Sequence, residues 1–295
     1  MLHQSRLRGV IAAIATPLDQ QGAPDPDRFI RLAEHLLENG CDGLNVLGTT
    51  GEATSFTVAE RTELMQAVAA SGLDLSQIMV GTGAAATGDA VRLTGAAAAL
   101  GFAGALILPP FYYKGVTDAG IVDYFRPIAA ASAALPLYLY NFPAMTGITY
   151  APALVRLLMQ HFPGRIAGLK DSSGDLAYAR EIAAIGPELA VFPSSEAVLL
   201  DARRGDFAGC ISATANLNAS LCARAFRDGD EDALKKAVAI RGLFDGKPLV
   251  SGVKAMLAYI HGDKALAAVR APLVEASAEE KAALAAAYDM LAEPI

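Results

Sequence analysis

Residues 137–170 read LYLYNFPAMTGITYAPALVRLLMQHFPGRIAGLK and contain two short apolar runs joined by one helical pattern. The apolar runs are Leu137–Asn141 and Ile166–Lys170, and the helical pattern covers about 151–160. A strand, a helix and a second strand in this order form the unit that connects two parallel strands. The fold therefore depends on how often this unit is repeated along the chain.

The same alternation extends over most of the sequence. Strand-like apolar runs follow one another at intervals of roughly 25–35 residues, with helical patterns between them. Most of the runs are continuously apolar, which is typical of strands that are covered on both faces. The eight predicted strands are Gly9–Ala15, Gly43–Leu47, Ile78–Gly81, Ala105–Leu108, Leu137–Asn141, Ile166–Lys170, Ala190–Phe192 and Cys210–Ser212.

Eight strands, each followed by a helix, predict an α/β fold of the (β/α)8 TIM barrel type, whose ordinary size is about 250 residues. An open, doubly wound sheet is the alternative. Helix starts are indicated by Asp25-Pro26, with a proline in the first turn, and by the capping-box spacing of Thr57–Glu60. The first of these helices is expected to run to about Asn39. Further helices are predicted near 88–100, 117–133, 151–160, 175–185 and 196–204.

The sequence after Ala215 contains helical patterns only, near 218–228, 231–244, 249–260 and 277–291. No linker rich in serine, proline or charge separates two domains. We therefore expect a barrel over residues 1–228 and a small C-terminal helical extension over residues 229–295, packed on the barrel as one structural unit.

Composition excludes several classes of protein. The 295 residues are 53% hydrophobic and carry a formal net charge of -7, so the chain can bury a large core and has no basic field for DNA or RNA. The three cysteines, Cys41, Cys210 and Cys222, are widely spaced, and neither cysteine nor histidine shows metal-ligand spacing. We expect no disulfide framework and no metal site, and the simplest setting is a reducing cytoplasm.

Two uncharged runs, Leu93–Tyr113 and Ile128–Val155, have the length of a membrane span. Prolines interrupt both runs, and glycines divide the first one further into a helix end, a turn and a strand. The apolar segment Val10–Ala15 after Arg6 and Arg8 is shorter than a secretory signal requires. These segments are predicted to be buried parts of a globular fold, and no membrane partner is expected.

Chemistry in a barrel is carried by residues at the carboxyl ends of the strands. The second predicted strand is followed by Gly48-Thr49-Thr50-Gly51-Glu52, where glycines let backbone N–H groups approach an anion; an ordinary turn is the alternative. The sixth strand ends in Lys170, which points either into the barrel mouth or sideways to a carboxylate such as Asp171. A desolvated lysine amine is the nucleophile that forms an imine with a carbonyl. Lys254, inside an apolar helical pattern, is a second lysine of interest.

Tyrosines follow two other strands. Tyr138 and Tyr140 share one face of the fifth strand, and Tyr140, nearer the carboxyl end, is expected in the mouth, where a phenol could move protons. A core tyrosine with a satisfied hydroxyl is the alternative. The fourth strand leads into Pro109–Tyr113, an aromatic loop that is either a surface cluster or a contact between subunits.

These residues resemble the dihydrodipicolinate synthase / N-acetylneuraminate lyase family of pyruvate-dependent class I aldolases. The resemblance covers most of the chain. The motifs most specific to the family are GTTGE, YNxP and GxK. The matching segments, in chain order, are ATPL of Ala15–Leu18, GTTGE of Gly48–Glu52, PFYY of Pro110–Tyr113, YNFPAMTG of Tyr140–Gly147, GLKDSSGD of Gly168–Asp175 and GCISATAN of Gly209–Asn216.

The resemblance implies a role for each matching residue. Lys170 matches the lysine that forms a Schiff base with pyruvate or a 2-keto acid, and Tyr140 matches the tyrosine that relays protons at the imine. Thr49 matches a hydroxyl that links this tyrosine to a second tyrosine. Tyr112 matches that second tyrosine, which in the family reaches in from a neighbouring subunit. Thr50 matches the threonine that holds the pyruvate carboxylate. At the eighth strand, Ile211 matches a residue whose backbone lies against the pyruvyl group.

Two departures from the family pattern bear on the substrate. Dihydrodipicolinate synthases carry an arginine in YNxPxRTG for the carboxylate of aspartate semialdehyde, and Met145 stands in its place here. A thioether cannot bind a carboxylate, so this activity is disfavoured. Sialic acid lyases have a second acidic residue where this chain has Ala197. A smaller polyhydroxylated 2-keto acid is expected instead, bound by the polar residues Ser172, Ser194, Ser195 and Glu196.

The sequence thus predicts a lyase that reversibly cleaves a 2-keto-3-deoxy sugar acid or related 2-keto acid into pyruvate and an aldehyde. No cofactor beyond the covalent imine on Lys170 is expected. A dehydratase or deaminase that uses the same imine is the near alternative, and 4-hydroxy-tetrahydrodipicolinate synthase is disfavoured by Met145. A degenerate barrel that binds a keto acid without turnover is the non-enzyme alternative. The family resemblance implies a homo-oligomer, a tetramer built as a dimer of dimers.

Overall fold

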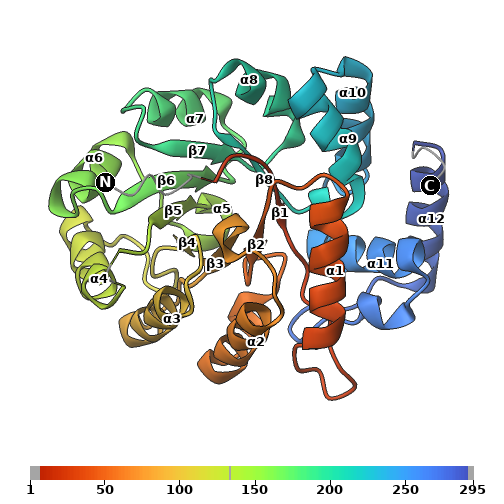
Figure 1. Ribbon diagram of the computed structural model, residues 1–295, viewed down its shortest axis with the longest axis horizontal. Coiled ribbons are helices and arrows are strands. Elements are labelled where there is room, and N and C mark those ends of the chain that lie inside the picture. Colours follow the sequence, from red (N-terminus) through yellow and green to blue (C-terminus); the bar gives the residue numbers. More distant parts are fainter. Residues whose placement is uncertain (1–6, 133, 292–295) are drawn as a thin grey trace.

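Eight parallel strands form the centre of the computed structural model, which describes residues 7–132 and 134–291 (Figure 1). The strands lie in chain order, and β8 returns to pair with β1. On the other side of β8, the Ala208 N–H donates to the Val191 carbonyl of β7 at 2.9 Å. The ring is therefore nearly closed. The strands are β1 (Gly9–Ala13), β2 (Gly43–Val46), β3 (Ile78–Gly81), β4 (Gly104–Ile107), β5 (Leu137–Asn141), β6 (Ile166–Asp171), β7 (Ala190–Pro193) and β8 (Gly209–Ser212).

The predicted (β/α)8 barrel is confirmed. The open doubly wound sheet is wrong, because such a sheet reverses its strand order and has two free edges, whereas the strands here follow chain order, β8 pairs with β1, and Ala208 before β8 donates to Val191 of β7. Figure 1 shows the helices surrounding the strands, with α9 to α12 gathered along one side. The barrel helices are α1 (Pro26–Glu38), α2 (Val58–Ala70), α3 (Thr87–Leu100), α4 (Asp118–Ala131), α5 (Pro143–Thr146), α6 (Pro152–His161), α7 (Leu176–Ala183), α8 (Leu199–Arg204) and α9 (Ala215–Asp228).

Local signals fix where several helices begin. The Asp25 side chain accepts a hydrogen bond from the Arg28 N–H at the start of α1, and Pro26 occupies the first turn. Thr57 and Glu60 form a capping box at the start of α2. Two differences from prediction are local. The short helix α5 was not predicted, and the predicted helix 196–204 is divided into a 3-10 turn, Glu196–Val198, and α8.

The strands separate two apolar cores. One lies between the strands and the surrounding helices. The other fills the barrel interior and includes Ile11, Met79, Tyr138, Tyr140 and Phe192. Side chains on a strand alternate between these two cores, as the two-residue period of a strand requires. Lys170 pairs in register with Tyr140 of β5 and Phe192 of β7, both interior residues, so the lysine also faces the barrel interior.

Gly168 precedes Lys170 on the same face of β6, and the close packing there explains the glycine. A Cβ at this position would lie 2.3 Å from the Ala190 carbonyl oxygen and 2.7 Å from a Tyr138 ring carbon. Neither the backbone of β7 nor a buried ring can move easily in a densely packed core. The glycine of the GxK pattern therefore lets β6 lie close to both neighbours and keeps the lysine in register.

The chain after Asp228 folds into α10 (Glu231–Gly242), α11 (Leu249–His261) and α12 (Ala278–Asp289). These helices pack against α9 and against one another. Along residues 7–132 and 134–291, no helix has both the length and the apolar character of a membrane span. The uncharged run Leu93–Tyr113 forms the end of α3, strand β4 and part of the following loop.

Candidate active site

A cavity of about 440 Å³ opens at the carboxyl ends of the strands, within the size range of small-molecule sites. Its floor is formed by residues at the ends of β2, β5, β6, β7 and β8, and its side by the segment that leads into α11. The lining includes seven of the candidate catalytic and binding residues, Thr49, Thr50, Tyr140, Lys170, Ser172, Ser194 and Ile211, and also Met145. Catalytic sites of barrels lie at this end.

Lys170 is enclosed by the barrel and is only 4% exposed. Its Nζ lies 4.4 Å from the centroid of the Tyr140 ring. The alternative partner, Asp171, is turned away: its carboxylate accepts from the Asn141 Nδ2 at 2.7 Å and from the Ser173 hydroxyl at 2.8 Å. No carboxylate within the described ranges forms an ion pair with Lys170. The amine is thus directed to the cavity and to Tyr140, as imine formation requires.

The Tyr140 phenol is held between Lys170 and the loop after β2. Its hydroxyl lies 3.3 Å from the Thr49 Oγ1. Burial is the largest single influence and raises the pKa of Tyr140, but the Lys170 charge and hydrogen bonds from Thr49, Ser172 and Lys170 together outweigh it. The pKa of this phenol therefore lies below its ordinary value, which suits a group that gives and takes protons.

The loop Gly48–Gly51 is held in a strained backbone conformation. Leu47 before it and Glu52 after it both have a φ of 55°, in the left-handed region that non-glycine residues seldom adopt. A Cβ on Gly48 would lie 2.5 Å from the Oδ1 of the buried Asn45 side chain, so any larger residue at this position would have to displace that amide. Strain of this kind persists only where the surroundings enforce it.

A buried ion pair provides that enforcement. The Lys254 ammonium of α11 donates to the Glu52 carboxylate and, at 2.8 Å, to the Thr16 carbonyl. The other Glu52 oxygen accepts from the Arg270 N–H at 2.7 Å. Burial, the largest influence, lowers the pKa of Lys254, and Glu52 opposes this effect. Lys254 therefore fixes the end of the threonine loop to α11 rather than reaching the cavity.

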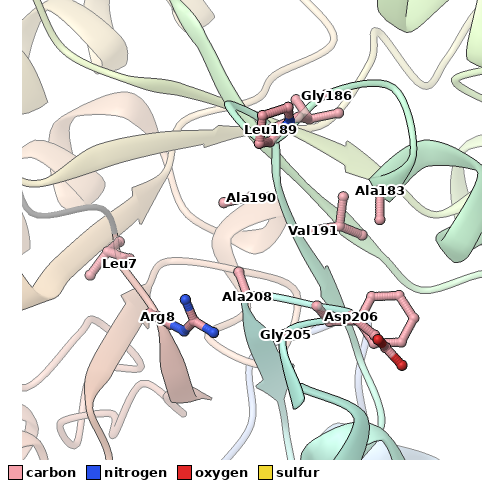
Figure 2. A pocket seen from close by; sticks show the side chains of 12 residues that line it. Leu7, Arg8, Ala183, Gly186, Leu189, Ala190, Val191, Gly205, Asp206 and Ala208 are labelled. Atoms are coloured by element: carbon pink, nitrogen blue, oxygen red, sulfur yellow. The ribbon is translucent and has the colours of Figure 1, made fainter. Parts of the chain in front are cut away.

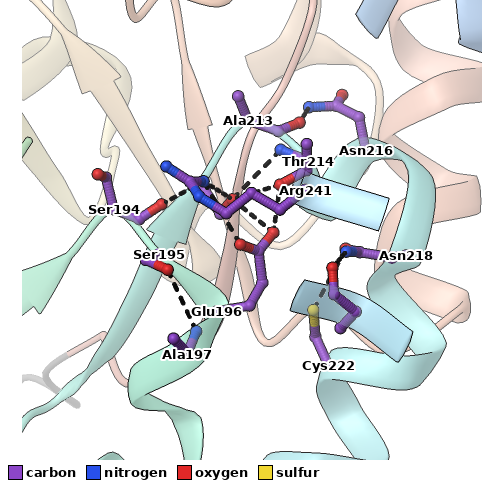
Figure 3. Close-up of polar contacts among 12 residues, drawn as sticks. Ser194, Ser195, Glu196, Ala197, Ala213, Thr214, Asn216, Asn218, Cys222 and Arg241 are labelled. Atoms are coloured by element: carbon purple, nitrogen blue, oxygen red, sulfur yellow. Dashed lines mark hydrogen bonds and ion pairs between the residues drawn. The ribbon is translucent and has the colours of Figure 1, made fainter. Parts of the chain in front are cut away.

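Two of the expected substrate-binding residues lie outside the cavity lining. Ser195 caps the turn after β7, where its hydroxyl accepts from the Ala197 N–H at 3.3 Å. Glu196 is fully buried and accepts hydrogen bonds from the hydroxyls of Ser212 and Thr214. Figure 3 shows its carboxylate directed toward Arg241. Both side chains are turned away because the chain enters a 3-10 helix directly after Ser194 and Ser195.

Arg241 and Lys247 also line the cavity, and no sequence pattern indicated either residue. Arg241 belongs to α10, and Lys247 lies between α10 and α11. Both are far along the chain from the strand ends. Their position depends on how the last helices fold back over the barrel, which local patterns do not reveal. The predicted residue Tyr112 lies outside the cavity on the loop after β4, and its side chain is 75% exposed.

A second hollow, of about 250 Å³, lies at the opposite end of the barrel (Figure 2). It is formed by residues that precede β1, β7 and β8, and its charged side chains, Arg8 and Asp206, are exposed. The amino-terminal end of a barrel usually serves stability rather than chemistry. The residues that the structure describes contain no group of three or more metal-ligating side chains, and all three cysteines are buried and free.

Comparison with known proteins relates this chain to one enzyme family. Residues 6–290 match the dihydrodipicolinate synthetase family. The chain belongs to this family. A relative from Chloroflexus aurantiacus, described as an uncharacterized DapA-like lyase, is 34% identical over 291 residues, which are 96% of this chain and 97% of that protein.

Two solved structures have the same fold. The crystal structure of dihydrodipicolinate synthase from Agrobacterium tumefaciens superposes with a TM-score of 0.89 at 30% identity, covering 96% of this chain and 99% of that one. A doubly substituted variant of the 2-keto-3-deoxygluconate aldolase from Sulfolobus solfataricus superposes with a TM-score of 0.85. That likeness covers 96% of this chain and 95% of the aldolase at 22% identity, so it concerns the fold alone.

The low pKa of Tyr140 gives a testable prediction for this family member. In Lys170→Met the nearby positive charge and its hydrogen bond are lost while burial remains, so the Tyr140 titration should move to higher pH. Ultraviolet difference titration of each protein against a matched Tyr140→Phe variant isolates this phenol from the other tyrosines. A midpoint at or above that of an ordinary tyrosine in the wild type, or no shift in Lys170→Met, would contradict the electrostatic account.

Proposed function

We propose that this protein is a Schiff-base lyase that reversibly cleaves a 2-keto-3-deoxy sugar acid or related 2-keto acid into pyruvate and an aldehyde. The observation that carries the proposal is the position of Lys170, which is enclosed at the base of the cavity without a carboxylate partner and beside Tyr140. Membership of the family supports an enzyme that handles pyruvate. The proposed chemistry uses no cofactor beyond the imine, and a reducing cytoplasm remains the proposed setting.

The proposed reaction begins when the Lys170 nitrogen attacks the keto carbon C2. The carbonyl oxygen leaves as water, and a protonated imine remains. A base then removes the proton of the C4 hydroxyl, the C3–C4 bond breaks, and its electron pair moves through C3 to the imine nitrogen. The products of this step are an aldehyde and an enamine, which is far more stable than a free carbanion. Protonation of C3 and hydrolysis of the imine release pyruvate and the amine.

Tyr140 is the proposed proton carrier in these steps, with Thr49 as its hydrogen-bond partner. Thr50, at the cavity wall, is proposed to hold the carboxylate of the pyruvyl part, and the Ile211 backbone to lie against it. Holding the reacting carbon next to the amine in this way can supply several kcal/mol of the barrier reduction. Ser172 and Ser194 line the same cavity and are proposed to bind substrate hydroxyls, whereas Ser195 and Glu196 are proposed to act only through their neighbours.

A second candidate activity is 4-hydroxy-tetrahydrodipicolinate synthesis, because a dihydrodipicolinate synthase is among the similar structures. Met145 lines the cavity and is the residue that replaces the arginine of that group. A thioether offers no charge and only a weak acceptor to a substrate carboxylate. Met145 therefore disfavours this second activity.

The substrate class is tested by assaying pyruvate release from a panel of 2-keto-3-deoxy acids and, separately, pyruvate consumption in the presence of aspartate semialdehyde. We expect free pyruvate and an aldehyde from at least one sugar acid and no useful conversion of aspartate semialdehyde. Product analysis by mass spectrometry distinguishes cleavage from dehydration or deamination, in which the carbon skeleton stays whole. Efficient synthesis from aspartate semialdehyde, or an intact skeleton in every product, would overturn the lyase proposal.

We also propose a homo-oligomer, a dimer of dimers, in which Tyr112 completes the proton relay of a neighbouring subunit. Its exposed position outside its own cavity is consistent with such a role. In Tyr112→Phe, turnover should fall by about 10²-fold or more, as for other acid–base groups, while imine formation with pyruvate is largely retained. Sedimentation velocity should show a tetramer. A monomer with full activity, or equal loss of turnover and imine formation, would exclude the shared relay.

A further inference from the structure

We infer that Arg241, with Lys247 of the same cavity lining, binds a second anionic group at the far end of the substrate, a carboxylate or a phosphate ester. This inference rests on the proposed function, since it concerns the part of a 2-keto acid that leaves as the aldehyde. It narrows the substrate class from sugar acids in general to those that carry negative charge at both ends.

The charges that line the cavity are the first observation. Three charged side chains line it, Lys170, Arg241 and Lys247, and all three are cations. Lys170 is assigned to the imine, and Thr50 to the carboxylate next to the keto group. Two cations therefore remain at the cavity wall: Arg241, whose Nη1 lies 3.4 Å from the Glu196 carboxylate, and Lys247, whose Nζ also donates to the Leu243 carbonyl at 2.8 Å. No carboxylate in the lining is available for an ammonium group. An amino aldehyde such as aspartate semialdehyde would bring its own positive charge to this wall.

The geometry of Arg241 is the second observation. Its Nη1 donates to the Ser194 carbonyl at 2.9 Å and lies 3.4 Å from both the Glu196 Oε2 and the Ser212 Oγ. Its Nε and Nη2 have no hydrogen-bond partner among the residues that the structure describes. The side chain is 27% exposed and contributes to the cavity wall. One edge of the guanidinium is thus anchored while donors remain for a ligand, and this planar fork suits a carboxylate or phosphate.

Glu196 explains how the arginine is held in place. Its Oε1 accepts from the Ser212 hydroxyl at 2.7 Å and from the Thr214 hydroxyl, and its Oε2 faces Arg241 (Figure 3). The carboxylate is fully buried and does not reach the ligand. Glu196 is therefore a positioning residue: β8 orients it, and it orients the guanidinium at the cavity wall.

The specificity test compares three six-carbon 2-keto-3-deoxy acids that differ only at C6, which carries a hydroxyl, a carboxylate or a phosphate ester. We expect kcat/KM for at least one anionic acid to exceed that of the neutral acid by about 10- to 100-fold, since hydrogen bonds to charged groups are the stronger ones. The preference should weaken at high salt if Lys247 at the solvent edge contributes. The two anionic substrates show whether carboxylate or phosphate fits better.

Variants assign the preference to residues. Arg241→Met should abolish most of it, and Lys247→Gln should reduce it. Arg241→Met alone leaves the Glu196 carboxylate buried without a cation. The double variant that carries both Arg241→Met and Glu196→Gln removes the two opposite charges together and so keeps the charge balance. Arg126→Met, which removes an exposed arginine of α4 that pairs only with Asp123 of its own helix, is the matched control. It should retain the full preference.

A binding measurement separates this inference from the lyase proposal. In Lys170→Ala no imine can form, and calorimetry then compares the affinities of the three acids directly. Tighter binding of an anionic acid that is lost with Arg241→Met supports the subsite even if the proposed cleavage fails. Equal or tighter binding of the neutral acid would overturn the inference. A preference for an anionic acid that is unchanged in the double variant with Arg241→Met and Glu196→Gln would do the same.

Discussion

A lysine amine enclosed in the barrel mouth without a carboxylate partner is the constraint on which the chemistry of this site depends. The strand pairing puts Lys170 between Tyr140 and Phe192, and the interior core keeps β6 from shifting by one residue. A shift of that size would turn the side chain outward to the helices. Gly168 makes the close approach of β6 to its neighbours possible. Packing around the strands therefore determines where the proposed nucleophile stands.

The chain contains a second buried lysine, and the contrast explains their different roles. Lys254 is satisfied by the Glu52 carboxylate and the Thr16 carbonyl, and removing one member of such a pair would leave an uncompensated buried charge. Its effect is structural, because Glu52 closes the strained loop that carries Thr49 and Thr50. One lysine thus orders the loop from α11, while the other faces the cavity that the loop helps to form.

Sequence patterns were sufficient to predict the strands, their order in the barrel and the residues at the strand ends. Continuous apolar runs indicate buried strands, and the two-residue alternation of side chains along a strand indicates which residues share a face. They were insufficient where the backbone leaves the strand. Ser195 and Glu196 follow β7 closely, yet the 3-10 turn directs both away from the cavity. Arg241 and Lys247 were not anticipated, since only the packing of α10 and α11 against the barrel brings them to the wall. Tyr112 lies on an exposed loop after β4, so its proposed role requires contact with a second copy of the chain.

Lys170, and not Lys254, is the amine proposed to attack the carbonyl of a 2-keto acid. The most direct measurement is to incubate the protein with pyruvate and borohydride, digest it and locate the reduced adduct by mass spectrometry. We predict one adduct per chain, on the peptide that contains Lys170, and none in Lys170→Ala. An unmodified protein, or an adduct on a different lysine, would contradict this assignment.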